Sequence, residues 1–240
     1  MDKDLLIHYD IKAYTANIIL IEYTSMIYII GGPPRCGKTS AALILAKKTR
    51  AVYLPVNYFR TVLLPFLSPS CLQKKFPVFC IKQRLQYNND IIFSHYSADE
   101  LVRAYRTQAR AVWPSIMTCM QKALRDEVSI VFEGYQLEPD YLAEFLKHNS
   151  HACQYIRIVF LYRNDHNAIR NGLKKGCAQT DWILKNTKQP ETLEKVSAFI
   201  SSYSEQLQKA AHAHGFTTYN TERHFHWRIR RAVRYLINGA

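Results

Sequence analysis

The sequence is short of acidic residues, with 19 aspartates and glutamates against 32 lysines and arginines and a formal net charge of +13. Such an imbalance predicts a surface that attracts anions: nucleotides, phosphorylated metabolites, nucleic acid or acidic lipid head groups. Part of the excess lies in residues 223–234, which hold five arginines and no acid. This run is typical either of the solvated face of a terminal helix or of a nucleic-acid or lipid contact.

The sequence also lacks closely spaced cysteines and a long apolar run. Its six cysteines are scattered without a Cys-x-x-Cys pair, unlike the framework of a secreted disulfide scaffold. The apolar stretch 17–30 is interrupted by Glu22, Thr24 and Ser25 and is too short to span a bilayer. The first residues, MDKDLL, are acidic and unlike a secretory signal. We therefore expect a cytoplasmic protein without a membrane anchor.

Low complexity and polar bias are absent as well, since 48% of the 240 residues are hydrophobic and 12% are aromatic. This length and composition suit one substantial α/β core rather than a disordered chain. Residues 1–25 precede the first clear element and are interpreted as an N-terminal extension. We expect this extension to be an added strand, a flexible arm or an over-extended start. The last alternative rests on Met26, where the domain of residues 26–240 could begin.

Apolar runs alternate with helix-like runs along the rest of the chain. Predicted strands cover residues 26–31, 51–55, 128–134, 156–162 and 216–221. Predicted helices cover residues 38–48, 56–65, 97–125, 139–147, 165–173, 190–213 and the C-terminal end. Pro114 should kink or split the helix that the capping box Ser97–Glu100 begins, and residues 68–93 are expected to be irregular. The alternation predicts an α/β fold, a five-stranded parallel sheet with helices on both faces.

The stretch GPPRCGKT, directly after the first strand, satisfies the phosphate-loop pattern G-x-x-x-x-G-K-[ST]. Backbone amides of such a loop converge on phosphates at a helix N-terminus, its lysine reaches the β and γ oxygens, and its threonine holds Mg²⁺. The alternative is a glycine turn that only joins strand to helix. The predicted nucleotide contacts are Gly32, Pro33, Pro34, Arg35, Cys36, Gly37, Lys38, Thr39 and Ser40.

Glu133 closes the apolar strand 128–134 and is the candidate carboxylate for the metal. A phosphate-loop site needs a carboxylate at the end of a neighbouring strand, to hold Mg²⁺ directly or through water. Lys38 and Glu133 are thus predicted catalytic residues, with Thr39 and Glu133 at the metal. A solvent-exposed glutamate at a strand end is the alternative.

About seventy residues separate the second and third predicted strands, more than one crossover helix requires. We interpret residues 57–127 as an insertion that binds the phosphate acceptor. Its long helix carries Arg103, Arg106 and Arg110 on one face, and Arg60 could join them. Arginines would suit a phosphate or carboxylate on the acceptor, whereas a solvated helix face is the alternative reading.

Asn57 follows the second strand, where many small-molecule P-loop kinases place an aspartate that accepts the proton of a hydroxyl. An amide cannot act as that base. Three alternatives stay open: Glu133 or Asp99 serves instead, the acceptor is already an anion and needs no base, or the chain does not transfer phosphate.

Residues 163–189 are basic and rich in turn formers, and we interpret them as a lid that closes over the phosphates and excludes water. Arg170 is the preferred lid arginine. Asn220, after the last strand, is the candidate contact for the nucleotide base.

The stretches IIGGPPRCGKT, VFEGYQLEPDYLAEFL, VFLYRND and TDWILKN together resemble a bacterial family of P-loop kinase-like proteins. These are distantly related to adenylate kinase and often described as 2-phosphoglycerate kinase-like. The resemblance covers residues 26–238 and implies a P-loop NTPase fold of the nucleoside-monophosphate-kinase type, with the phosphate-loop strand central and the Glu133 strand beside it. It also implies ATP and Mg²⁺ as cofactors, roles for Lys38, Thr39 and Glu133, and a lid position for Asp181 and Trp182. Asn57 departs from the pattern of the related kinases.

The favoured function is an ATP-dependent phosphotransferase that transfers the γ-phosphoryl group of Mg-ATP to a small anionic acceptor, a nucleotide or phosphorylated metabolite. A nucleotide-binding regulator with little catalysis is one alternative, motivated by Asn57. A nucleic-acid-linked ATPase or polynucleotide kinase is another, motivated by the charge, and a kinase of nucleotide sugars is a third. The sequence leaves the acceptor and the oligomeric state open.

Overall fold

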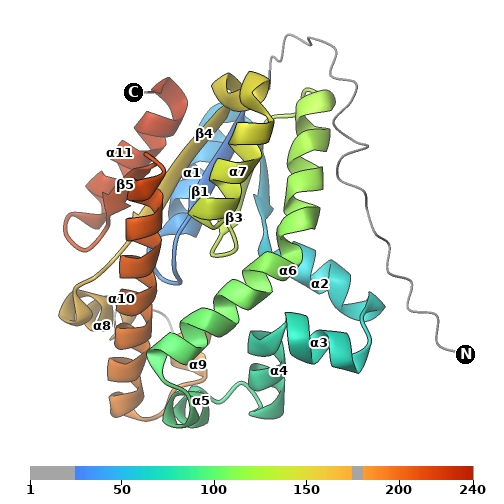
Figure 1. Ribbon diagram of the computed structural model, residues 1–240. Helices are drawn as coiled ribbons and strands as arrows, with labels where there is room; N and C mark the ends of the chain where they lie inside the picture. Colours follow the sequence, from blue (N-terminus) through green and yellow to red (C-terminus); the bar gives the residue numbers. More distant parts are fainter. Residues whose placement is uncertain (1–24, 175–180, 240) are drawn as a thin grey trace, which may run out of the picture.

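A parallel sheet forms the centre of the molecule (Figure 1). The computed structural model describes residues 25–174 and 181–239, and within them the sheet has five strands in the order β2-β3-β1-β4-β5. The strands are β1 Ile27–Gly31, β2 Val52–Pro55, β3 Ile130–Gly134, β4 Ile156–Tyr162 and β5 Thr217–Asn220. The predicted α/β class and five-stranded parallel sheet are confirmed, with β1 central and β3 beside it as the resemblance implied.

The three central strands are apolar because both of their faces are covered. Every residue of β1 and β3 is buried, and β4 is buried over most of its length. Strands of a parallel sheet that is covered on both sides need this continuous apolar character, whereas β2 and β5 at the two edges are half-exposed. The core therefore lies on both sides of β1, directly beneath the loop that leaves it.

Helices cover both faces of the sheet. On one face α1 (Lys38–Thr49) packs against β1, β2 and β3 and against α11 (Phe225–Asn238), which also contacts β4 and β5. In Figure 1 the opposite face carries α6 (Ala98–Arg125), α7 (Pro139–His148) and α10 (Pro190–Ala213). The helix α10 contacts α6 and α7 as well as β4 and β5, and thus joins the helices of that face.

The segment 68–93 is helical, so the prediction of an irregular stretch was wrong. It contains α3 (Pro69–Lys75), α4 (Pro77–Arg84) and α5 (Asn89–His95). The two prolines are not breaks but the first residues of α3 and α4, where a missing amide hydrogen costs nothing. With α2 (Asn57–Leu63) and the 3₁₀ turn Leu64–Phe66, these helices lie beside the first part of α6 in Figure 1.

The capping box of α6 is formed as predicted, with the Ser97 hydroxyl accepting from the Glu100 amide and the Glu100 carboxylate accepting from the Ser97 amide. Pro114 lies within one continuous helix, so the predicted split does not occur, and Figure 1 shows α6 bent along its length. The short helices α8 (His166–Lys174) and α9 (Trp182–Lys185) and the 3₁₀ segment Ser150–Tyr155 complete the described elements.

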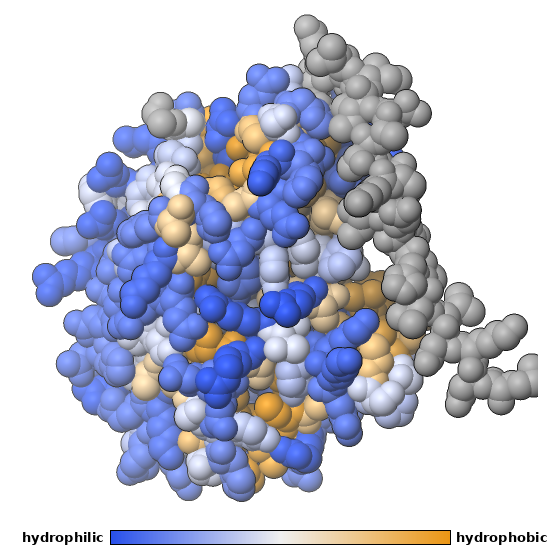
Figure 2. All heavy atoms as spheres, in the orientation of Figure 1, coloured by the Kyte–Doolittle hydropathy of each residue, from blue (hydrophilic) through white to orange (hydrophobic). Residues whose placement is uncertain are grey.

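Parts of two predicted segments fall outside the described residues: residues 1–24 of the extension and 175–180 of the lid. Within the described ranges no helix has the length and apolar character needed to cross a bilayer. The face of the molecule in Figure 2 is largely hydrophilic, with apolar side chains in small groups.

The capping box gives a test of the fold. Ser97→Ala removes the hydroxyl that satisfies a first-turn amide of α6, and we expect the free energy of unfolding to fall by about 1 kcal/mol. Thr118→Ala, at an exposed position of the same helix, is the control and should change it by less than about 0.5 kcal/mol. Urea unfolding measures both, and equal losses would contradict the capping role.

Candidate functional site

The loop between β1 and α1 has the geometry of a phosphate-binding loop. Gly37 caps α1 with φ 89°, and Gly32 has φ 146°, both in the region that favours glycine. A Cβ on Gly32 would lie 2.2 Å from the carbonyl oxygen of Leu161, and one on Gly37 would lie 2.6 Å from the ring of Phe225. The backbone of this loop thus passes too close to its neighbours for any side chain at these two positions.

Lys38, the first residue of α1, is buried and turns back over the loop. Its ammonium donates a hydrogen bond of 2.7 Å to the carbonyl oxygen of Pro33 and lies 4.0 Å from Oε1 of Glu133. The lysine is therefore held between the loop and the end of β3, where a phosphate chain in the loop would meet it.

Glu133 is buried at the end of β3 and is not the solvent-exposed glutamate of the alternative reading. Its Oε2 accepts hydrogen bonds from the Thr39 hydroxyl at 3.2 Å and from the Tyr53 hydroxyl at 3.0 Å. Burial, together with the Glu133 charge, raises the pKa of Tyr53, so this phenol stays protonated and keeps donating to the carboxylate.

Thr39 and Glu133 place a hydroxyl oxygen and a carboxylate oxygen side by side. Hard oxygen ligands of this kind suit Mg²⁺, which usually takes one or two protein ligands and completes its shell with water and substrate phosphates. The described ranges contain no cluster of three or more His, Cys, Asp or Glu residues that could hold a metal ion. The two residues fit a Mg²⁺ ion that arrives with a nucleotide.

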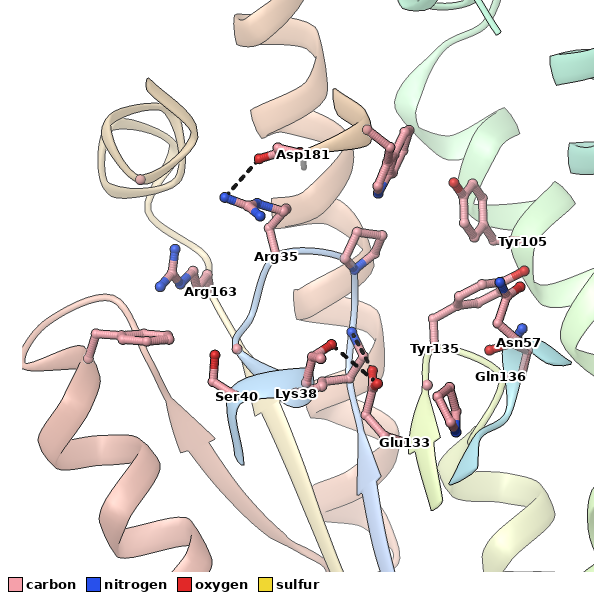
Figure 3. A pocket seen from close by; sticks show the side chains of 18 of the residues that line it. Arg35, Lys38, Ser40, Asn57, Tyr105, Glu133, Tyr135, Gln136, Arg163 and Asp181 are labelled. Carbon is pink, nitrogen blue, oxygen red and sulfur yellow. Dashed lines mark hydrogen bonds and ion pairs between the residues drawn. The ribbon is translucent and has the colours of Figure 1, made fainter. Parts of the chain in front are cut away.

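A cavity of about 1200 Å³ opens around these residues. In Figure 3 Lys38 and Glu133 occupy its middle, Arg163 and Ser40 lie on one side, and Asn57, Tyr105, Tyr135 and Gln136 lie on the other. Of the predicted loop contacts, Pro34, Arg35, Gly37, Lys38, Thr39 and Ser40 line the cavity. Gly32, Pro33 and the buried Cys36 complete the loop without lining it. The site thus has two sides that meet at Lys38.

Arg163 forms much of the first side. Its Nε donates to the Thr221 hydroxyl at 3.1 Å, and its guanidinium lies 5.2 Å from the centre of the Phe225 ring. The Thr221 hydroxyl in turn donates to the carbonyl oxygen of Cys36 at 3.0 Å, which ties the end of β5 to the phosphate loop. Because Arg163 directly follows β4, the position at the strand end was the sequence signal for it.

The predicted base contact and lid arginine lie outside the cavity lining. Asn220 uses its side-chain oxygen to accept from the amide of Glu222 at 2.8 Å, while Glu222, Phe225 and His226 line the cavity instead. Arg170 forms an ion pair with Glu194 of α10. The α8 residues that line the cavity are Ala168, Asn171 and Gly172.

Three of the four predicted acceptor arginines also lie outside the lining. Arg103 is exposed, Arg106 lies 3.6 Å from the buried carboxylate of Glu138, and Arg110 donates to the Tyr141 hydroxyl at 3.1 Å. Arg106 and Arg110 thus contact α7 and the residue before it. Burial raises the pKa of Glu138, and Arg106 opposes that shift.

Arg60 and Asn57 do line the second side of the cavity, together with residues that the sequence did not single out. Lys82 of α4 is the main one: its ammonium lies 3.8 Å from the centre of a Trp182 ring and donates to the Tyr105 hydroxyl at 3.1 Å. Since the segment holding Lys82 was expected to be irregular, no helix face could be assigned to it. Asp99, a candidate base, accepts from the Ser202 hydroxyl and does not line the cavity.

The loop is also linked to α9. Nη2 of Arg35 lies 2.9 Å from Oδ2 of Asp181, an ion pair drawn in Figure 3. The other oxygen of Asp181 accepts from the amide of Ile183 and caps α9. Asp181 and Trp182 both line the cavity. Their membership of a lid, which the resemblance implied, stays a prediction.

The arginine run near the C-terminus lies on α11. Its Arg230, Arg231 and Arg234 are exposed, and Arg228 and Arg231 lie 5.0 and 4.9 Å from the centre of the Trp227 ring. Both readings of this run require such an exposed helix face, so a contact with nucleic acid or lipid stays a prediction.

A search against protein-family models finds no match. Among curated proteins the chain is similar to mevalonate-3-phosphate 5-kinase of Thermoplasma acidophilum, with 26% identity over 151 residues, which cover 62% of this chain and 67% of that one. Among solved structures it resembles a gluconokinase from Sinorhizobium meliloti 1021, with 10% identity, 90% and 93% of the two chains covered and a TM-score of 0.47. A shikimate kinase from Bacteroides thetaiotaomicron gives 15% identity, 88% and 96% coverage and a TM-score of 0.46.

By name, all three similar proteins are kinases that act on small molecules. The sequence similarity agrees with the broader part of the predicted resemblance, a relation to P-loop kinases. The narrower description as 2-phosphoglycerate kinase-like has no counterpart among these three and stays a prediction.

Proposed function

We propose that this protein is an ATP-dependent P-loop kinase that transfers the γ-phosphoryl group of Mg-ATP to a small anionic acceptor. The observation that carries the proposal is one cavity with a phosphate loop and the Thr39–Glu133 pair at its middle, and with cations on its second side that form no ion pair within the described residues. The similarity to the Thermoplasma kinase supports the reaction class, and the name of that protein describes an acceptor that already bears a phosphate.

Residues at the middle and on the first side of the cavity would hold the donor. The loop amides and Lys38 bind the β and γ phosphates, and Thr39 and Glu133 hold the ion. Bound Mg²⁺ would supply neutralisation of phosphate charge. Arg163, at the end of β4, faces the same space and stabilises negative charge on the transferring group.

The second side favours an acceptor that needs no general base. Each carboxylate that lines the described part of the cavity already has partners: Glu133 with Thr39 and Tyr53, Asp181 with Arg35, and Glu222 with two backbone amides. Asn57 cannot take a proton. An anionic acceptor oxygen attacks the γ phosphorus directly, the bond from that phosphorus to the bridging oxygen breaks, and ADP leaves.

Transfer itself is the first test. The protein is mixed with γ-labelled Mg-ATP and a panel of nucleoside monophosphates, phosphorylated hydroxy acids and neutral sugars. We expect label in an anionic acceptor and in no neutral sugar. Lys38→Met should lower the rate at least about 100-fold, because it removes a positive charge from the transferring phosphate. Lys47→Met, which removes an exposed lysine of the same helix, is the matched control.

Two results would count against this function. If nucleotide binds, and Lys38→Met abolishes that binding, yet no acceptor is labelled, the phosphotransferase proposal fails and a nucleotide-binding regulator remains. Label in neutral sugars alone would refute the anionic acceptor.

A second test compares the roles of two arginines in the predicted lid, Arg163 and Arg170. Arg163→Met should lower kcat by roughly 100-fold, because it removes a cation from the cavity at the point where charge develops. Arg170→Met, which removes a cation paired with Glu194, should change kcat only a few-fold. Thermal unfolding of both variants monitors the fold. A larger loss of kcat in Arg170→Met than in Arg163→Met would instead favour Arg170 as the lid arginine.

A further inference from the structure

Two cations share the second side of the cavity without a counter-ion. Arg60 of α2 and Lys82 of α4 both line it, and neither forms an ion pair with a carboxylate of the described residues. Burial, with the nearby Arg60 charge adding to it, lowers the pKa of Lys82 to about 8. Like charges brought together in a partly dry site repel each other unless an anion joins them.

Aromatic rings take the place of a counter-ion in the free protein. The Lys82 ammonium lies over Trp182, and the Arg60 guanidinium lies 5.9 Å from the centre of the Phe79 ring. Nε of Arg60 has no hydrogen-bond partner within the described chain. Rings attract cations but accept no strong hydrogen bond, so these donors keep their capacity for an anionic oxygen.

Gln136 adds a second and independent signal. This residue is fully buried, lines the same cavity, and neither its Nε2 nor its Oε1 finds a hydrogen-bond partner in the described residues. Figure 3 shows it near Asn57 and Tyr135 on the second side. A buried amide with both groups unpaired is costly and rare, which indicates a ligand that supplies both a donor and an acceptor.

The position of Gln136 is fixed by its neighbours. A Cβ on Gly134 would lie 2.7 Å from Oε1 of Gln136 and 2.2 Å from a methyl of Val56. Gly134, the residue directly after Glu133 at the end of β3, thus leaves room for the Gln136 amide.

We propose, building on the proposed kinase function, that Arg60, Lys82 and Gln136 form the acceptor subsite and that it takes a phosphomonoester carrying a neutral hydroxyl or amide group. A phosphomonoester has a charge of about −1.5 to −2 at pH 7, which matches two cations, whereas a single carboxylate matches one. Arg60 and Lys82 bind the phosphate, and Gln136 pairs with the neutral group. This assignment does not depend on which acceptor oxygen receives the phosphoryl group.

Binding of simple probes to the full chain tests the subsite. In the presence of Mg²⁺ and a non-hydrolysable ATP analogue, calorimetry compares inorganic phosphate, glycerol 1-phosphate and acetate. We expect glycerol 1-phosphate to bind more tightly than inorganic phosphate, and acetate at least about 10-fold more weakly than either. Arg60→Met and Lys82→Met should each weaken both phosphate probes at least about 10-fold. Gln136→Leu should weaken only glycerol 1-phosphate.

Arg84→Met is the matched control, because Arg84 is an exposed cation of the same helix as Lys82 and does not line the cavity. It should leave both affinities unchanged, and unchanged binding of the ATP analogue shows that each variant is folded. If Lys82→Met fails to fold, Lys82→Gln is used in its place. The subsite would be overturned if Arg84→Met lost as much phosphate affinity as the other two variants. It would also be overturned if phosphate affinity did not depend on Arg60 and Lys82.

Failure of this proposal is distinguishable from failure of the kinase function. Phosphate binding that requires Arg60 and Lys82 in a protein that labels no acceptor refutes the kinase and leaves the subsite standing. Transfer to an acceptor whose KM is the same in Arg60→Met and Lys82→Met refutes the subsite and leaves the kinase standing.

The pH dependence of phosphate binding gives another expected outcome. Lys82 loses its charge as pH rises through about 8, while the probe stays dianionic, so phosphate affinity should fall between pH 7.5 and about 9.5. The other charged or titratable groups facing Lys82 are Arg60, Tyr87 and Tyr105, and burial raises the pKa of Tyr105. Lys82→Met should abolish this fall, and an unchanged profile in that variant would contradict the role of Lys82.

Discussion

The parallel pairing of β1 with β3 sets Ile30 opposite Glu133 and Gly31 opposite Gly134. Since both strands end at the same edge, the phosphate loop leaves β1 where the carboxylate ends β3, and Thr39 meets Glu133 at 3.2 Å. A slip of one residue would turn Glu133 to the other face of the sheet and separate it from Thr39. The register is held by the apolar side chains of both strands, which are buried on both faces, so the core itself fixes how the phosphate loop lies relative to Glu133.

The charges of the cavity are distributed unevenly. Around the phosphate loop, each lining carboxylate of the described residues has partners, for example Glu133 with two hydroxyls and Asp181 with Arg35. On the second side Arg60 and Lys82 lie near each other with aromatic rings around them. The overall charge of +13 only predicts that anions are attracted, whereas this local imbalance is the place where we propose that an anion binds.

Much of this could be predicted from the sequence, because local patterns determine it. Apolar runs that fill both faces of a strand identified β1, β3 and β4. The glycine pattern with its following lysine located the loop between β1 and α1. The missed features depend on packing between distant segments. Arg106 and Arg110 do share a helix face, but that face packs beside α7 and not at the cavity. Lys82 and Gln136 carry no local signal, since only the tertiary fold brings α4 and the end of β3 to one space.

The structure also changes the meaning of Asn57. In the sequence it marks the loss of a general base, since an amide cannot accept the proton of a hydroxyl. In the fold it lies on α2 one turn before Arg60, and both residues line the cavity. An aspartate there would stand at the i, i+3 spacing that favours an ion pair, and it would give Arg60 a counter-ion within its own helix. The amide leaves Arg60 unpaired and therefore free for an anionic ligand. The absence of a base and the proposed anion site are thus two consequences of the same residue, and together they favour an acceptor that brings its own negative charge.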